Sequence, residues 1–141
     1  MAAINQKRVW LGAVVACIVW TVWSMAINVG LIGARYQEAQ QAKLLLDPPR
    51  YPLFYGQWIV VLFILSVIIA WLYASVRSTQ GPGPRTALLV GLFVGFAAGF
   101  PTNFATATWS PIDRYFPMMW MLELWVGAVL AALVAGWLYK E

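Results

Sequence analysis

Four long apolar segments dominate this sequence and leave few choices of fold. They cover about residues 9–34, 58–76, 87–109 and 118–139, and each is nearly free of charge. A helix needs about 20 apolar residues to cross a hydrocarbon core about 30 Å thick, and each segment reaches or approaches that length. A helix also satisfies its own backbone hydrogen bonds inside a bilayer. The sequence therefore predicts an all-α, integral membrane four-helix bundle, formed by residues 1–141 as a single transmembrane domain.

The composition also indicates that the chain folds in a lipid bilayer. Hydrophobic residues make up 62% of the chain and charged residues only 10%, whereas soluble domains carry about 25% charged residues. The lipid bilayer is thus the first predicted partner. The small excess of basic residues is explained by membrane topology and anionic lipid, and no nucleic acid is expected.

Basic residues near the segment ends predict the orientation of the chain. Lys7 and Arg8 precede the first segment, which continues through INVGLIGA and is therefore expected to remain an uncleaved span. One side of the membrane would hold Lys7, Arg8, Arg77, Arg85 and Lys140, and the other Arg35, Lys43, Arg50 and Arg114 together with Glu38, Asp47 and Asp113. This bias favours cytoplasmic amino and carboxyl termini and antiparallel neighbouring helices.

The predicted outer loop covers residues 35–57 and begins with RYQEAQQAKLLL, which contains no helix breaker before Asp47-Pro48-Pro49. Two structures fit this stretch. Either the first helix projects beyond the membrane, or a short amphipathic helix lies on the outer surface.

Several absences narrow the chemistry. The chain contains no His, and its single Cys17 excludes an internal disulfide or a CxxC redox pair. No glycine loop of the GxxxxGK[ST] kind is present. No catalytic residue, metal site or cofactor is therefore predicted.

Small residues recur every four positions in the last two spans and so form one stripe on each helix. Such stripes let transmembrane helices approach closely. Since the two spans run in opposite directions, we expect the stripes to face each other, with Gly99 against Gly127. The predicted packing residues are Gly91, Gly95 and Gly99 in the third span, and Gly127, Ala131 and Ala135 in the fourth, with Gly95 facing Ala131 and Gly91 facing Ala135. A related stripe in the first span comprises Gly12, Ala16, Trp20, Ser24 and Asn28.

Polar residues extend these stripes toward the outer side. Asn103 lies six residues before Trp109 and Glu123 six residues after Pro117, so each is about 9 Å inside its helix end. We expect the two side chains to form a hydrogen-bonded unit. The predicted outer polar patch consists of Asn28, Thr102, Asn103, Thr106 and Glu123.

Glu123 is the leading candidate for function, because a carboxylate within a span is costly and usually faces protein or water. Two roles stay open. It either accepts hydrogen bonds from Asn103 or pairs with Arg114 to lock the helices, or it takes part in binding or transport.

The whole-chain layout resembles that of small four-pass bacterial inner-membrane proteins. The likeness rests on the GxxxGxxxG third span, the outer loop WSPIDRYFP and the ending GWLYKE. It implies a multi-pass protein of the bacterial cytoplasmic membrane and no particular activity. The chain departs from the four-pass quinone-reducing oxidoreductases in lacking their CxxC pair.

Three classes of function follow. The leading prediction is a non-catalytic accessory subunit that packs against other transmembrane helices, from partner subunits or from copies of itself. The first alternative is a small oligomeric transporter or channel that uses the outer polar patch around Glu123. A weak repeat, AWLYAS and GWLYKE, is compatible with duplicated helix pairs and favours that alternative. The third is a membrane-embedded enzyme acting on lipid-like substrates through Glu123, Asp113 and Arg114.

Overall fold

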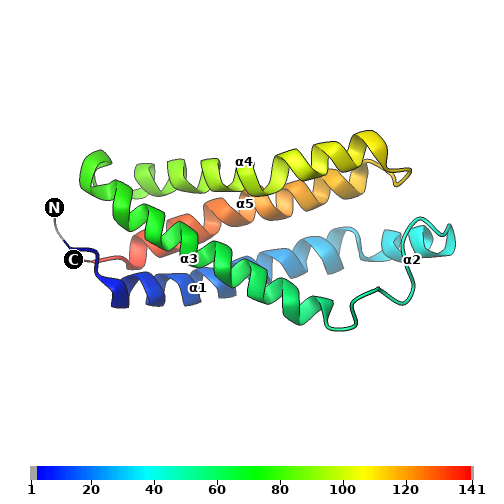
Figure 1. The fold of residues 1–141 in the computed structure, drawn as a ribbon, viewed down its shortest axis with the longest axis horizontal. Helices are drawn as coiled ribbons and strands as arrows, with labels where there is room; N and C mark the ends of the chain where they lie inside the picture. Colours follow the sequence, from blue (N-terminus) through cyan, green and yellow to red (C-terminus); the bar gives the residue numbers. More distant parts are fainter. Residues whose placement is uncertain (1–2, 141) are drawn as a thin grey trace.

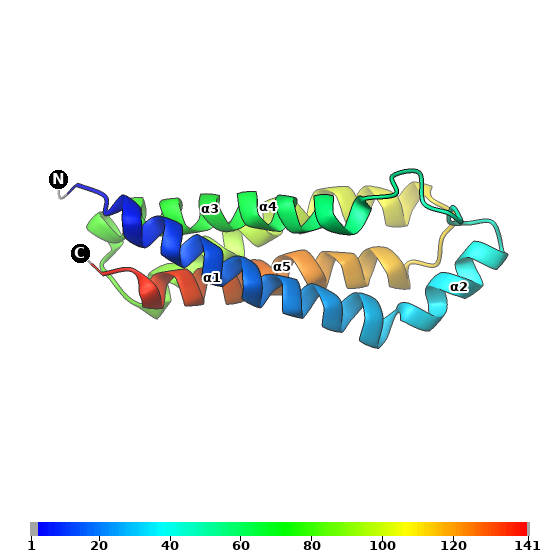
Figure 2. The ribbon, with the colours of Figure 1, turned by 90° about the horizontal axis from the view of Figure 1, so that it is seen from below.

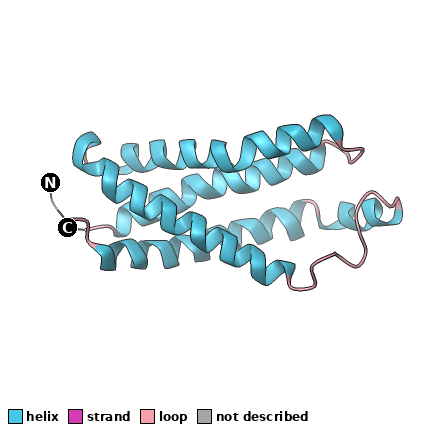
Figure 3. Cartoon of the chain, viewed as in Figure 1, coloured by secondary structure: helices cyan, strands magenta, loops and turns pink. Residues whose placement is uncertain are grey.

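The computed structural model describes residues 3–140, and within that range it is helical with no β-strand (Figure 3). The first helix, α1, spans Gln6–Met25 and continues as a π-helical segment, η1, over Ala26–Leu31. The remaining helices are α2 (Gly33–Gln41), α3 (Phe54–Gln80), α4 (Pro84–Trp109) and α5 (Tyr115–Leu138).

Four of these helical stretches are long and apolar enough to cross a membrane. They are Gln6–Leu31, α3, α4 and α5. The prediction of an all-α, multi-pass membrane bundle is confirmed. The longest helix, α3, begins at Phe54 and so takes in residues that the sequence assigned to the outer loop.

The four spans lie antiparallel to their chain neighbours, and both termini reach the same end of the bundle (Figure 1). We call this the terminal end, and it also holds the turn Gly81–Gly83 between α3 and α4. The opposite end carries α2 with the loops 42–53 and 110–114, and we call it the loop end (Figures 1 and 2). Helices α3 and α5 each contact the other three spans, whereas α1 and α4 do not contact each other.

The first span bends rather than running straight into the loop. After η1 the chain turns at Ile32, which is fully buried, and α2 then folds across the loop end (Figure 2). Ile32 and Ala39 pack in a small apolar cluster with Ile112, Phe116 and Met119. Of the two predicted structures, a projecting first helix and a separate surface helix, neither is adopted as such. The chain continues from the first span through a bend into α2, which packs on the start of α5.

The predicted contacts between the small-residue stripes of α4 and α5 are wrong. A methyl group built on Gly95 would lie 2.6–2.9 Å from Trp125, and one on Gly91 would lie 2.6 Å from the Cα of Val129. Gly99 likewise faces Met121. Gly95 therefore accommodates the Trp125 side chain, while Gly91 and Gly99 lie against the backbone of Val129 and Met121, and none of the three meets its predicted partner.

The small-residue stripe of α5 packs on α1 instead. Gly127 lies directly against the indole of Trp20, and Gly12 approaches Ala135, with a built methyl 3.3 Å from its Cα. Ala131 is fully buried in the same core. Large side chains fill the space that glycines leave, because protein interiors are close-packed. The small-residue stripe of α5 therefore packs against the stripe of the first span, with Gly127 against the large Trp20 and Ala135 against the small Gly12.

Candidate functional site

Glu123 lies at the junction of three helices in the loop half of the bundle. Its side chain is only 2% exposed. One carboxyl oxygen, Oε1, accepts hydrogen bonds from the Ser24 hydroxyl of α1 and from the Trp58 indole of α3, the latter at 2.9 Å. Trp20 of α1 donates to the backbone carbonyl of Glu123 at 3.2 Å. The residue therefore joins α5 to both α1 and α3.

A second set of hydrogen bonds extends from this junction toward the loop end. Asn28 donates its amide to the Ser24 carbonyl at 3.0 Å, and the Tyr36 hydroxyl donates to the Asn28 amide oxygen at 2.8 Å. The Trp120 indole in turn donates to the Tyr36 hydroxyl at 2.8 Å. Glu123, Ser24, Asn28, Tyr36 and Trp120 thus form one connected chain, which we call the polar network.

The π-helical segment η1 carries Asn28 and gives the polar network its geometry. A π-turn widens the helix by one residue, and such turns are frequent at functional sites. Its wider turn ends where the Ile32 amide donates to the Ile27 carbonyl at 3.1 Å. The chain then redirects into α2, and Tyr36 comes within reach of Asn28.

Tyr36 lies in α2, beyond the first span, and its environment favours the neutral phenol. Burial raises the pKa of the Tyr36 hydroxyl, and repulsion from Glu123 adds to this effect, while the hydrogen bond from Trp120 opposes it. A neutral phenol both donates and accepts. Tyr36 uses both capacities here, since it donates to Asn28 and accepts from Trp120.

The predicted outer polar patch does not assemble. Asn103 is buried on α4, but its amide donates to the Gly99 carbonyl of the same helix at 2.7 Å. Thr102 is exposed, and Thr106 donates to the Thr102 carbonyl at 2.9 Å. The expected hydrogen bond between Asn103 and Glu123 is wrong, because the glycine face of α4 meets the side of α5 that carries Met121 and Trp125. Only Asn28 and Glu123 of the five share a network.

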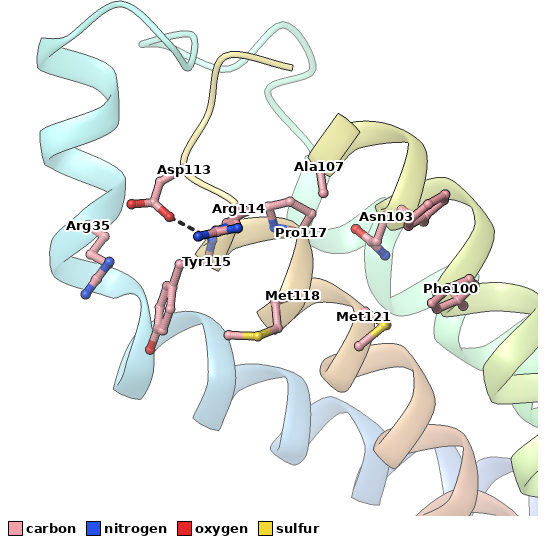
Figure 4. Close-up of a pocket in the computed structure, with 11 residues that line it drawn as sticks. Arg35, Phe100, Asn103, Ala107, Asp113, Arg114, Tyr115, Pro117, Met118 and Met121 are labelled. Atoms are coloured by element: carbon pink, nitrogen blue, oxygen red, sulfur yellow. Dashed lines mark hydrogen bonds between the residues drawn. The ribbon is translucent and has the colours of Figure 1, made fainter. Parts of the chain in front are cut away.

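The alternative pairing of Glu123 with Arg114 is also wrong. Arg114 lies at the start of α5 and lines a surface cavity (Figure 4). Its neighbour Asp113 accepts a hydrogen bond from the Tyr115 amide at 2.8 Å, the dashed line in that view. A carboxylate that satisfies a free amide in the first turn stabilises the helix start. Asp113 therefore satisfies the first amide of α5, a use that stabilises the start of this helix.

Sequence reasoning missed three members of this site. Trp58, Tyr36 and Trp120 carry an indole or phenol, and such side chains are typical of the membrane interface, so their sequence positions alone do not indicate a buried site. Their polar atoms are instead used inside the bundle, where aromatic N–H and O–H groups need partners. No sequence pattern indicated these three residues. The sequence did place Ser24, which donates to Glu123, on the same four-residue stripe of the first span as Asn28.

The arrangement is suited to holding helices together. Ser24, Trp58 and Trp20 donate to Glu123 as neutral groups from fixed helix positions, and none of them is a base or a metal ligand. Over residues 3–140 no group of three His, Cys, Asp or Glu side chains lies close enough to hold a metal ion.

No family model, curated protein or solved structure matches the chain.

Proposed function

We propose that this protein is a non-catalytic accessory subunit that packs against other transmembrane helices of a larger membrane complex. The observation that carries the proposal is an outward face of small residues on the loop half of α4. Ala97, Pro101, Thr102 and Ala105 are exposed there. We call these four residues the α4 face.

The α4 face is poorly suited to lipid and well suited to a second helix. Small side chains let two helix backbones approach closely, which supplies packing where lipid offers no hydrophobic driving force. Pro101 has no N–H, so the regular helical bond to the carbonyl of Ala97 is missing. A carbonyl left without its helical donor is costly in hydrocarbon and favours a polar neighbour.

Other outward surfaces differ from the α4 face. On α1 the exposed side chains include Val14, Ile18 and Val22, which are 46–63% exposed. Such branched aliphatic residues are what a lipid-facing helix carries. Helix α4 also exposes Phe93 and Phe104, at 73% and 62%, so the contrast is between α1 and the four residues of the α4 face, and it supports that face as the partner-binding side.

The hydrogen bonds and the burial of Glu123 favour a structural role over a catalytic one. Its Oε1 atom is occupied by Ser24 and Trp58, and the side chain is almost fully buried. An intramembrane carboxyl that ties helices together has a use that needs no substrate. These hydrogen bonds hold α5, against which α4 packs, to α1 and α3.

Substitutions on the two faces test the proposal. Thr102→Phe places a bulky ring on the α4 face, and Ile18→Phe is the matched control on α1. We expect the wild type, extracted in mild detergent, to migrate in a complex larger than its own 15.7 kDa. Thr102→Phe should release it from that complex, and Ile18→Phe should not. A wild-type protein that is monomeric under these conditions would contradict the proposal.

The proposed location is the bacterial cytoplasmic membrane, with the terminal end in the cytoplasm. Lys7 and Arg8 lie at the start of α1, Arg77 in the last turn of α3 and Arg85 at the start of α4, and these helix ends meet at the terminal end (Figure 1). Basic residues close to span ends are retained on the cytoplasmic side.

A small oligomeric transporter or channel is the second candidate, favoured by the polar network. A buried carboxyl, Glu123, is connected through a π-helical segment to Tyr36 at the loop end. Glu123→Gln keeps a hydrogen-bond acceptor oxygen and removes the carboxyl group. Loss of ion flux into liposomes in this variant, with assembly intact, would support transport.

A further inference from the structure

A cavity of about 480 Å³ opens at the loop end, separate from the polar network (Figure 4). It lies between α4 and α5 and is bordered by α2. We propose that this cavity binds a glycerophospholipid with an anionic headgroup, taken from the leaflet at the loop end. Three layers of side chains in the cavity support this proposal: a charged rim, one buried amide and an apolar floor.

The rim of the cavity is basic on balance. Arg35 of α2 and Arg114 at the start of α5 both line it and are exposed. Asp113 is the opposing charge, and its carboxylate accepts a hydrogen bond from the Tyr115 amide. The Arg35 guanidinium lies 4.1 Å from the centre of the Tyr115 ring, which fixes its place beside the opening. Two guanidinium groups at the membrane surface recognise a phosphate through several hydrogen bonds.

Below the rim, Asn103 supplies a buried polar group that faces the cavity. The residue is 8% exposed, and its single hydrogen bond within residues 3–140 runs from the amide nitrogen to the Gly99 carbonyl. One N–H and the amide oxygen are therefore left for a ligand, because an amide offers two donors and an acceptor. Asn103 lies about 9 Å inside the end of α4. An ester carbonyl, which sits below the phosphate in a glycerophospholipid, can accept from this N–H.

The floor of the cavity is apolar. It is formed by Phe100 and Phe104 of α4 and by Met118 and Met121 of α5. Phe104 and Met118 remain 62% and 46% exposed, so an acyl chain would cover apolar surface there. Flexible methionine side chains adapt to an irregular chain.

The order of these layers matches the order of groups in a bilayer lipid. Charge, a neutral polar group and apolar surface follow one another from the loop end inward, as phosphate, ester and acyl chain do. A free soluble anion would use only the rim. The buried amide and the apolar floor therefore favour a phospholipid.

Native mass spectrometry of the purified protein tests the inference. The probes are phosphatidylglycerol, which is anionic, and phosphatidylethanolamine, which is zwitterionic, added separately to delipidated protein in detergent. We expect phosphatidylglycerol to bind at least tenfold more tightly. Replacing Arg35 and Arg114 together by Ala should reduce its affinity about tenfold and leave that of phosphatidylethanolamine nearly unchanged. Arg50→Ala, in the loop at the same end, is the matched control and should have no effect.

A second variant tests the cavity independently of charge. Ala107 is exposed and lines the cavity, so Ala107→Trp should obstruct it and weaken binding of both lipids without disturbing the core. Equal affinities for the two lipids, or equal losses in the Arg35/Arg114 and Arg50 variants, would overturn the inference. Palmitate displacing phosphatidylglycerol at equal concentration would overturn the assignment to a phospholipid. Each result is independent of whether the α4 face binds another helix.

Discussion

Removing the Glu123 carboxyl should loosen the bundle by a measurable amount. Glu123→Ala deletes two hydrogen bonds, from Ser24 and Trp58, that join α5 to α1 and α3. Interhelical hydrogen bonds in membranes contribute about 0.6 kcal/mol on average and up to about 1.7 kcal/mol. The expected loss is therefore about 1–3 kcal/mol in the free energy of unfolding, measured by titration with a denaturing detergent. Glu123→Gln keeps an acceptor oxygen and should cost less than about 1 kcal/mol.

Double-mutant cycles show whether this loss comes from the stated contacts. Ser24→Ala combined with Glu123→Ala should show coupling, because residues in contact do not add. Asn103→Ala combined with Glu123→Ala is the control, since Asn103 bonds to its own helix at Gly99. These two effects should add within about 0.5 kcal/mol. Coupling of Glu123 to Asn103, with none to Ser24, would refute the reasoning.

Three further predictions concern packing, pH and topology. Gly127→Ala should lower the thermal unfolding temperature strongly, because the added methyl group would overlap the Trp20 indole of α1. Gly56→Ala is the control and should have little effect, since a methyl group there meets nothing within 4 Å. The pKa of Tyr36 is raised above 10.0 in the folded protein, so Tyr36 contributes stability that is present below about pH 10 and lost as the pH rises through its folded pKa. In alkaline unfolding measurements, Tyr36→Phe should therefore lack this pH-dependent loss of stability. In a background without the native cysteine, a cysteine at Ser110 should react with impermeant reagent from outside the cell and one at Ser78 should not; the reverse would invert the proposed orientation.

The spans could be predicted from the sequence because length and polarity alone decide them. Any helix of about 20 apolar residues satisfies the bilayer whatever its neighbours are. The burial of Glu123 could be anticipated for the same reason, since an isolated carboxyl does not face lipid. These are properties of one helix at a time.

The contacts between helices could not be predicted in this way. A four-residue period identifies a stripe but does not say which neighbour it meets, and small stripes occur on α1, α4 and α5. The sequence argument paired small with small, whereas Gly95 accommodates Trp125 and Gly127 accommodates Trp20. Trp58 reaches Glu123 because α3 leans across the bundle, a fact that spacing within α3 does not encode.

Site-specific crosslinking along α4 tests the central claim most directly. Single cysteines at Ala97, Thr102 and Ala105 of the α4 face, in a background where Cys17 is replaced, would be treated with a short bifunctional reagent in native membranes. We expect crosslinks to another transmembrane chain from these positions, with none from a cysteine at Ile18 of α1. Crosslinks from Ile18 alone, or from no position in α4, would contradict it.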